Sequence, residues 1–321
     1  MNKIYNHKIV INKEQSLLRL DQALAKLTSY SRSQIKILLS NDNILKNEEI
    51  IKDASYKVKS GEKYIINIKI PELEKFDAEQ IPLDIIYEDN EIIVVNKKAG
   101  MVVHPSPGHY HGTLVNALIN HTKNLSDLND KNRPGIVHRI DKETSGLIVI
   151  AKDNITHDNL ANQFKEHTIS RKYKAIVWGQ PVNQTIEGYI ERHKINRKKM
   201  SLSKNEKGKY SKTFIKLLKT FEIASLIECE LKTGRTHQIR LHLTSLNSPV
   251  VGDKVYGKSK ISKFGKNKET FNKFLILKNF SRQALHAYHL GFKHPKSNKY
   301  IEFDSNLPND MEKLLELVVK Y

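Results

Sequence analysis

The sequence has little of several features that would narrow its function at once. Its 321 residues include a single cysteine, Cys229, which excludes an intramolecular disulfide and a cysteine-rich metal cluster. No apolar run approaches the ~18 residues that cross a membrane, and the first residues lack the apolar segment of a signal peptide. We therefore expect a protein of the reducing cytoplasm with no membrane association.

Acidic residues are scarce relative to basic ones. Asp and Glu number 35 against 54 Lys and Arg, which leaves a formal net charge of +19. A surplus of this size favours association with a polyanion, and nucleic acid is the commonest one in the cytoplasm. Lysine, asparagine and isoleucine are abundant throughout, so biased codon usage is an alternative explanation, and charge alone names no reaction.

The usual motifs of cofactor chemistry are also absent. The sequence has no Walker loop, no dinucleotide-binding glycine fingerprint and no G-x-S-x-G nucleophile elbow. His104, His109 and His111 lie in one loop, but no H-E-x-x-H or neighbouring acidic pattern accompanies them. We therefore expect neither a nucleotide cofactor nor a metal, and interpret this proline-rich loop as the wall of a cleft.

The beginning of the chain predicts a small module of two helices and a β-hairpin. Apolar spacing across residues 17–39 predicts two short helices, the second with Ser31 as its N-cap. Residues 50–70 are rich in β-formers, with a tight turn at Gly61. We divide the chain into an N-terminal arm (1–15), this module (16–75), a linker (76–82) and a larger domain (83–321).

Strand patterns dominate the larger domain. Helical spacing appears over residues 113–122, 157–167 and 236–246, and a short helix closes the chain. The strands between them are short and often paired like hairpins. This pattern predicts an α+β fold with a mixed, mostly antiparallel central sheet.

The most informative stretch is GIVHRIDKETSGLIVIAK, residues 135–152, which predicts two apolar strands joined by a polar turn. Asp141 lies in the turn near Arg139 and Lys142, whose positive charges favour the carboxylate that a nucleophile or base requires. A turn aspartate that only accepts backbone hydrogen bonds is the simpler interpretation. The segment alone therefore does not establish catalysis.

A second candidate segment is LKTGRTHQIRLHL, residues 231–243, which predicts a strand, a glycine turn and a helix capped by Thr233 or Thr236. His237 and Arg240 are three residues apart and can share a helix face with Thr236. An arginine there can bind a carboxylate or a phosphate. The alternative is a solvated basic helix face.

A third segment, RKYKAIVWG, predicts a strand with Tyr173 on one face between Lys172 and Lys174. A tyrosine flanked by cations can stack on a nucleobase and supply a phenol for proton transfer. Ordinary packing is the simpler role for a strand tyrosine.

Taken together, these segments resemble the RluA-type family of RNA pseudouridine synthases. The motifs occur in the family's order over about residues 83–305, as VVNKKAG, HPSPGH, GTLVNAL, GIVHRIDKETSGLIVIAK, RKYKAIVWG, LKTGRTHQIRLHL, VGDKVYG and RQALHAYHLGFKHP. RLDQALAKL with SRSQIKILL resembles the S4 RNA-binding module that precedes the catalytic domain in many members. The usual glycine near the S4 hairpin is replaced around Asn41–Asn43, so the RNA contacts of this module are less securely implied.

The resemblance implies a role for each matching residue. Asp141 corresponds to the essential aspartate, with Ile140 in place of the usual leucine before it. Tyr173 matches the tyrosine that stacks on the target base and assists proton removal at C5, and Arg240 matches the arginine that pairs with the aspartate. Further RNA contacts are assigned to Arg139, His138, Arg235, His237, Arg19 and Arg32.

The implied reaction is the isomerisation of uridine to pseudouridine in large-subunit ribosomal RNA, free or in a pre-ribosomal particle. It needs no cofactor, and we expect a monomer. The carboxylate either attacks the sugar or removes a sugar proton to give a glycal, and the sequence does not decide between these routes. Two other functions are compatible with parts of the sequence: a non-catalytic rRNA-binding or ribosome-assembly protein, and a metal-dependent RNA hydrolase that uses the three loop histidines.

Overall fold

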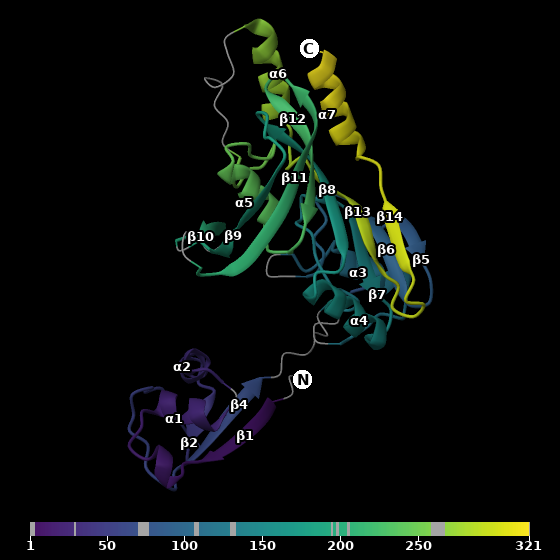
Figure 1. Cartoon of the computed structure of the whole chain (residues 1–321). Coiled ribbons are helices and arrows are strands. Elements are labelled where there is room, and N and C mark those ends of the chain that lie inside the picture. Colours follow the sequence, from purple (N-terminus) through teal and green to yellow (C-terminus); the bar gives the residue numbers. More distant parts are fainter. Residues whose placement is uncertain are drawn as a thin grey trace. The chain divides into compact units, whose positions relative to one another are not determined.

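The computed structural model divides into two units, Met1–Lys75 and Phe76–Tyr321, which are considered separately (Figure 1). It describes residues 4–28, 30–69, 77–105, 109–128, 133–193, 195–196, 199–203, 206–257 and 267–320. Among these residues, no helix is both long and apolar enough to cross a lipid bilayer.

The first unit is a four-stranded antiparallel sheet with two helices. Its strand order is β1-β4-β2-β3. The elements are β1 (Ile4–Val10), the 3-10 turn η1 (Lys13–Gln15), α1 (Leu20–Leu27), α2 (Arg32–Ser40), β2 (Ile44–Lys46), β3 (Glu49–Ile50) and β4 (Lys63–Lys69).

The helices of this unit form where the sequence predicts them. Ser31 is the N-cap of α2: its hydroxyl accepts from the Gln34 N–H at 3.3 Å, and the Gln34 side chain accepts from the Ser31 N–H at 2.7 Å. The predicted cap is confirmed. The apolar faces of both helices pack on the sheet around a buried core of Leu20, Leu24, Ile35, Leu39, Ile44, Tyr64 and Ile66.

Two segments differ from the expected boundaries. Residues 1–15 are expected to form an arm, but β1 pairs with β4 from Ile4 to Val10 and is an edge strand of the sheet. Residues 76–82 are expected to be a linker, but the Asn116 side chain donates to the Asp77 carbonyl at 2.9 Å, and the Glu79 carboxylate accepts from the Gly112 N–H. Backbone pairing in one case and side-chain anchoring in the other attach these segments to the units beside them.

The second unit is built on a ten-stranded sheet with order β10-β9-β11-β12-β8-β13-β7-β6-β5, and β14 also pairs with β13. The only parallel pair among the described strands is β7 with β13, so the predicted α+β fold with a mostly antiparallel sheet is confirmed. The strands are β5 (Ile85–Glu88), β6 (Ile92–Lys97), β7 (Ser145–Ala151), β8 (Ser170–Trp178), β9 (Gln184–Arg192), β10 (Met200–Ser203), β11 (Lys209–Phe221), β12 (Ala224–Leu231), β13 (Leu285–Lys293) and β14 (Tyr300–Asp304).

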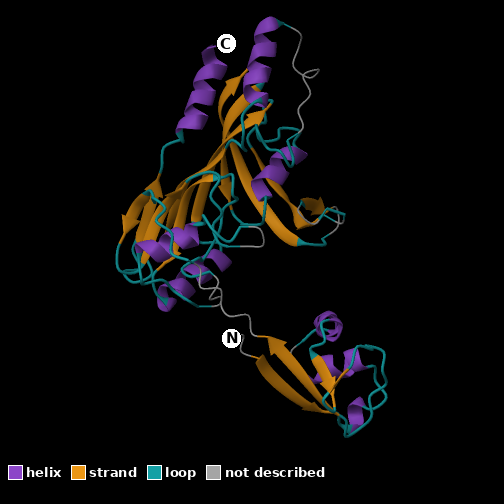
Figure 2. Cartoon of the chain, turned by 180° about the vertical axis from the view of Figure 1, so that it is seen from behind, coloured by secondary structure: helices purple, strands orange, loops and turns teal. Residues whose placement is uncertain are grey.

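Five helices cover parts of this sheet: α3 (Leu114–His121), α4 (Asn154–Lys165), α5 (Gln238–Ser245), α6 (Lys268–Lys278) and α7 (Asn309–Lys320). Figure 2 shows α6 and α7 next to each other at one end of the sheet, and the two helices are in contact. The sequence analysis does not anticipate α6, although Asn267 caps it and its buried residues Thr270, Phe274 and Leu277 have helical spacing.

The central strands β6 and β7 are buried along almost their whole length because both faces of the sheet are covered. Ile92 and Val94 pack into one core with α4, whereas Ile93 and Val95 pack into a second core with α3. The alternation of side chains along a strand explains this division. These two cores pack against both faces of β7, and Asp141 lies four residues before this strand begins.

One predicted strand is wrong. Residues 135–140, GIVHRI, form an irregular segment with a single isolated bridge between Ile136 and Ile150. Strand β13 pairs with β7 only at Ser145 and Gly146, and beyond that point the Ala151 N–H donates to the Gly135 carbonyl at 2.9 Å. The backbone bonding does not continue as a regular ladder. The segment instead lies over β7, where the Val149 N–H donates to Nε2 of His138 at 3.0 Å.

Candidate active site

A cavity of about 280 Å³ opens beside the start of β7. Three stretches of chain meet around it: the irregular segment with its following turn (137–144), strand β8, and the loop that enters α5 (234–240). These stretches belong to the three candidate segments of the sequence analysis, residues 135–152, 171–179 and 231–243. The lining residues that can carry chemistry are His138, Arg139, Asp141, Thr144, His167, Arg171, Tyr173, Arg235, His237 and Arg240.

Asp141 and Arg240 form an ion pair inside this cavity. Nη1 of Arg240 donates to Oδ2 of Asp141 at 2.8 Å, although the two residues are 99 positions apart in the chain. The Asp141 side chain is 24% exposed, whereas the Arg240 side chain is 6% exposed. The carboxylate is therefore both held by the guanidinium and reachable from the cavity.

Arg240 is itself anchored by a second carboxylate. Its Nε and Nη2 donate to the two oxygens of Asp253 at 2.7 and 2.9 Å, and Asp253 also accepts from the N–H groups of Val255 and Tyr256. Burial lowers the pKa of Arg240, but the hydrogen bonds that it donates to Asp253 and the charge of Asp141 outweigh this effect and raise the pKa overall. Arg240 is a permanent cation that spans two acids.

The helix that carries Arg240 starts differently from the prediction. Its N-cap is His237, in the left-handed region at φ 57°, and neither Thr233 nor Thr236 caps it. Gln238 organises the turn instead: its Oε1 accepts from the Thr233 hydroxyl and the Arg235 N–H at 2.8 and 3.0 Å. Its amide donates to β11, so this buried side chain ties the turn to the sheet.

His237 lies beside the acid. Its Nε2 is 3.9 Å from Oδ2 of Asp141, and its Nδ1 is hydrogen-bonded to the Tyr256 hydroxyl at 2.8 Å. Burial lowers the pKa of His237, against the opposing effect of Asp141. A neutral imidazole at this position adds no second fixed charge to the carboxylate.

Tyr173 faces the cavity from β8. Residues Tyr173, Ala175 and Val177 are buried on one side of the strand, as the predicted alternation requires. The ring is 8% exposed, and within the described parts of the chain its hydroxyl has no hydrogen-bond partner. Burial raises the pKa of the phenol, so it stays protonated at neutral pH.

The turn that carries Asp141 is clamped through its backbone. Lys97 is fully buried, and its Nζ donates to the carbonyls of Lys98, Met101 and Lys142 at 2.9, 2.9 and 3.2 Å. Arg282 donates to the Glu143 carbonyl at 3.2 Å. These contacts fix the turn without using the Asp141 side chain, and the sequence analysis assigns no role to either cation.

The remaining predicted residues of this unit line the same cavity in different ways. Arg139 is accessible to solvent, and the partial desolvation of its guanidinium by the surrounding chain lowers its pKa. Arg235 is half-buried, with Nε donating to the Tyr210 carbonyl at 2.9 Å. His138 has its Nε2 occupied by Val149 and its ring stacked on Phe164, and burial lowers its pKa to about 3. Its observed contacts hold the segment in place.

Arg19 and Arg32 lie in the first unit, where both pair with a buried carboxylate. Asp21 is fully buried and accepts from Nε of Arg19 at 3.3 Å and from Nη2 of Arg32 at 3.0 Å, with Lys36 at 3.7 Å. The three cations remain about half exposed, with side-chain exposures of 41%, 52% and 55%. One buried acid thus fixes three basic groups near the start of α2.

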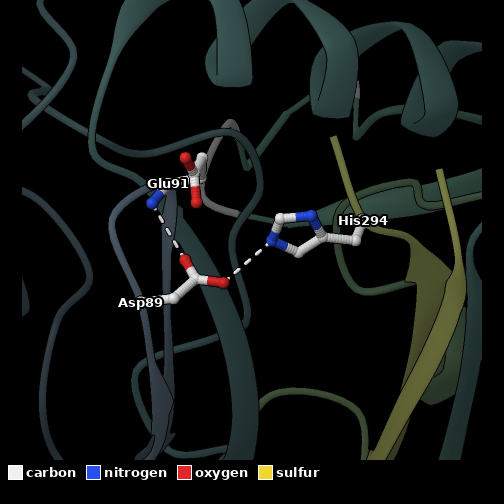
Figure 3. A group of neighbouring side chains, drawn as sticks. All are labelled: Asp89, Glu91 and His294. Carbon is white, nitrogen blue, oxygen red and sulfur yellow. Dashed lines mark hydrogen bonds and ion pairs between the residues drawn. The ribbon is translucent and has the colours of Figure 1, made fainter. Parts of the chain in front are cut away.

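Among the described residues, one group of side chains has the atoms and spacing of metal ligands: Asp89, Glu91 and His294 (Figure 3). Nδ1 of His294 accepts from the N–H groups of Lys296 and Ser297, so the ring proton is on Nε2 and is donated to Asp89 at 2.9 Å. Glu91 pairs with Lys296. Because the ligand atoms are already used, this group fits a structural link between two loops better than a metal site.

The loop histidines do not converge in the described structure. His104 is buried, whereas His109 and His111 are exposed, and Nδ1 of His111 is 3.3 Å from the Glu79 carboxylate. Among the described residues, none of the three belongs to a group of potential metal ligands.

Comparisons with known proteins agree with this fold. A family model described as RNA pseudouridylate synthase matches residues 91–245, and an S4 domain model matches residues 18–63. The chain is 42% identical over 319 residues to ribosomal large subunit pseudouridine synthase D of Zymomonas mobilis, covering 97% of each chain. It is 41% identical to an uncharacterized RNA pseudouridine synthase of Bacillus subtilis, covering 98% of each.

A solved human structure, RNA pseudouridylate synthase domain containing 4, has the same fold. Its TM-score is 0.56 at 22% identity, and the match covers 73% of this chain and 92% of that one. A fold of this kind with an S4 domain before it defines an RNA-modifying enzyme. The chain belongs to the RNA pseudouridine synthase family, as the near full-length relatives show, and the predicted family resemblance is confirmed.

Proposed function

We propose that this enzyme isomerises specific uridines to pseudouridine in the 23S RNA of the large ribosomal subunit, with Asp141 as the catalytic carboxylate. The observation that carries the proposal is the Asp141–Arg240 ion pair in a cavity that Tyr173 also lines. Relatives named for ribosomal large subunit modification over nearly the full chain supply the RNA class.

The reaction conserves all atoms of the nucleotide. The N1–C1′ bond breaks, the uracil turns, and a C5–C1′ bond forms; C5 then loses its proton and N1 ends as N–H. No electron is gained or lost overall, so the chemistry needs an anion near C1′ and a base-holding surface. Asp141 supplies the anion by attack on C1′ or by removal of a sugar proton, and both routes use the same carboxylate.

Arg240 keeps this carboxylate aimed at the cavity, since its other nitrogens are fixed by Asp253. Tyr173 offers a ring face to the detached uracil, which must not escape before it is rejoined. Its protonated hydroxyl is free to hydrogen-bond the base or to take part in proton transfer at C5.

A uridine inside an RNA helix must leave its stack to reach Asp141, at a cost of a few kcal/mol. Arg139 is the exposed cation at the cavity and can occupy the space that the base vacates. The first unit adds affinity through Arg19, Arg32 and Lys36, whose charges Asp21 gathers. We propose that the enzyme acts as a monomer on rRNA or a pre-ribosomal particle.

The carboxylate role is tested by Asp141→Asn, assayed by tritium release from RNA labelled at C5 of uridine. We expect loss of release with RNA affinity kept within about threefold, since the amide preserves shape but not charge. Glu143→Gln is the matched control, because it makes the same change two residues away on a side chain outside the cavity lining. Full activity of Asp141→Asn would refute the proposed mechanism.

The substrate is tested by mapping carbodiimide-reactive pseudouridines in 23S RNA from cells with and without the enzyme. We expect discrete sites to disappear in its absence and to return with the wild-type chain but not with Asp141→Asn. If the same sites return with Asp141→Asn, a non-catalytic role in ribosome assembly is supported instead.

A further inference from the structure

Arg171 is a buried cation in the active-site cavity that has no anionic partner. It lies on β8, is 8% exposed and lines the cavity. Its Nε is a buried donor without an acceptor, and among the described residues its guanidinium takes part in no hydrogen bond or ion pair. Burying a charge in this way is costly unless something compensates for it.

The groups around Arg171 do not neutralise it. They are cationic, neutral or aromatic: Arg235, His167, His138 and Phe164. Burial lowers the pKa of Arg171; Tyr173 opposes this shift, and the positive charge of Arg235 adds a smaller lowering. The contact that remains is with the Phe164 ring, whose centroid is 5.3 Å from Cζ.

Arg240 provides the contrast within the same cavity, because two carboxylates bind it. The cavity lining as a whole holds four arginines, Arg139, Arg171, Arg235 and Arg240, but one acid, Asp141. The excess of positive charge is therefore local to the cavity.

The backbone makes space for the guanidinium. A Cβ atom on Gly234 would lie 2.5 Å from Nη1 of Arg171, so the glycine before Arg235 permits the close approach. Arg171 and Tyr173 are two residues apart on one strand and share the face toward the cavity. Their Cα atoms are thus ~6.6 Å apart along the strand.

We propose that Arg171 is the phosphate-binding residue of the active site: it takes a backbone phosphate next to the flipped nucleotide while Tyr173 faces the base. This inference rests on the proposed function for the identity of the anion, an RNA phosphate. The free enzyme holds the buried charge unpaired, and the substrate supplies its partner. Arg171 is therefore a binding residue that discriminates a nucleotide in RNA from a free base or nucleoside.

The test compares Arg171→Met and Arg171→Lys with the wild type in the full-length chain. The probe is an unmodified 23S RNA transcript, with the dissociation constant measured over a series of KCl concentrations and the melting temperature measured without RNA. For Arg171→Met we expect affinity about tenfold lower and a salt slope shallower by about 0.7 to 0.9, as for one lost phosphate contact. We expect no fall in melting temperature, because the substitution breaks no hydrogen bond or ion pair of this side chain.

Lys172→Met is the matched control. It removes one positive charge from the next residue of β8, whose side chain lies on the opposite face of the sheet. We expect its salt slope to stay closer to wild type than that of Arg171→Met. An unchanged slope in Arg171→Met overturns the proposal, whatever its melting temperature.

A second arm keeps the proposal testable if Arg171→Met folds poorly. The probe is a hairpin RNA with one neutral methylphosphonate linkage beside the mapped uridine. The wild type should bind it about tenfold more weakly than the unmodified hairpin. For Arg171→Lys the loss of affinity between the two hairpins should be smaller. Equal losses in the two proteins at every linkage beside the uridine would overturn the proposal. If the wild type binds as expected but forms no pseudouridine, the proposed function fails while the phosphate site stands.

Discussion

The guanidinium of Arg240 donates from Nε and Nη2 to the two oxygens of Asp253, at 2.7 and 2.9 Å. This fork leaves Nη1 as the group that meets Asp141. A planar donor held at one edge by a bidentate partner points its other edge in a fixed direction. Asp253 is therefore a positioning residue for Asp141, although it lies behind Arg240 and outside the cavity lining.

Replacing Asp253 by Asn should slow the reaction more than it weakens binding. The amide cannot accept both hydrogen bonds from the guanidinium, so Arg240 moves and no longer holds the Asp141 carboxylate in position. We expect the single-turnover rate at saturating RNA to fall about 10- to 100-fold, with affinity within about threefold. Asp304→Asn, an exposed aspartate paired with His289, is the control and should keep the wild-type rate. A wild-type rate in Asp253→Asn would contradict the positioning role.

Lys97 should give the enzyme a measurable stability change at alkaline pH. Burial lowers the pKa of Lys97 to about 7, whereas the unfolded chain keeps this proton to about pH 10.4. Between these values the unfolded state binds one more proton, so this group makes the free energy of unfolding rise with pH, by up to ~1.4 kcal/mol per unit. Lys97→Met lacks this contribution.

The measurement is urea unfolding of wild type and Lys97→Met from pH 7 to 10. We expect the stability difference between them to grow in favour of the wild type as pH rises. Lys98→Met, which removes an exposed neighbour, should run parallel to the wild type. Parallel curves for Lys97→Met as well would show that the buried amine does not titrate near neutrality.

Buried histidines should destabilise the second unit in mild acid. Burial lowers the pKa of His242 to about 4, and its two ring nitrogens are hydrogen-bonded to the hydroxyls of Ser211 and Thr213. Below pH 6.5 the unfolded chain protonates this ring while the folded chain does not. The free energy of unfolding should therefore fall between pH 6.5 and 4, by up to ~1.4 kcal/mol per unit for this one group.

Urea unfolding of His242→Gln over this range should have a pH slope smaller than wild type by about one proton. His109→Gln, which changes an exposed histidine, should retain the wild-type slope. If His242→Gln retains it too, His242 is not held neutral in the fold.

In the first unit, Asp21→Asn should weaken RNA binding although it removes a negative charge. Arg19 and Arg32 both donate hydrogen bonds to this buried carboxylate, and without its negative charge their guanidinium groups are no longer held close together. Burial raises the pKa of Asp21, but the hydrogen bonds from Arg32 and Arg19 outweigh it and lower the pKa overall. We expect a several-fold loss of rRNA affinity in a filter-binding assay at 0.1 M salt, with the rate at saturating RNA unchanged.

Asp53→Asn is the control, since it removes a negative charge from the same unit at an exposed turn. General charge repulsion would make both variants bind RNA more tightly. Tighter RNA binding by Asp21→Asn would therefore contradict the role of Asp21 in holding Arg19 and Arg32 together.

The sequence alone determined the local features of this protein. Ser31 caps α2 because the capping box lies within four residues, and the alternation in β8 places Tyr173 on the buried face. The family could be identified from the sequence because its motifs are runs of contiguous residues that occur in the family's order along the chain. Features of this kind can be predicted without the tertiary structure because each depends on residues that are close together in the chain.

The tertiary structure decided everything that joins distant segments. Residues 135–140 have a strand pattern, yet the His138 side chain takes the Val149 N–H that a neighbouring strand would use, so they form an irregular segment before Asp141. The start of α5 follows the buried bonds of Gln238 rather than the threonines near it. The bridge from Asp141 through Arg240 to Asp253, and the unpaired charge of Arg171, depend on which side chains long-range packing brings together. Spacing in the sequence does not encode those distances, because they are set by sheet order and by what is buried beside each charge.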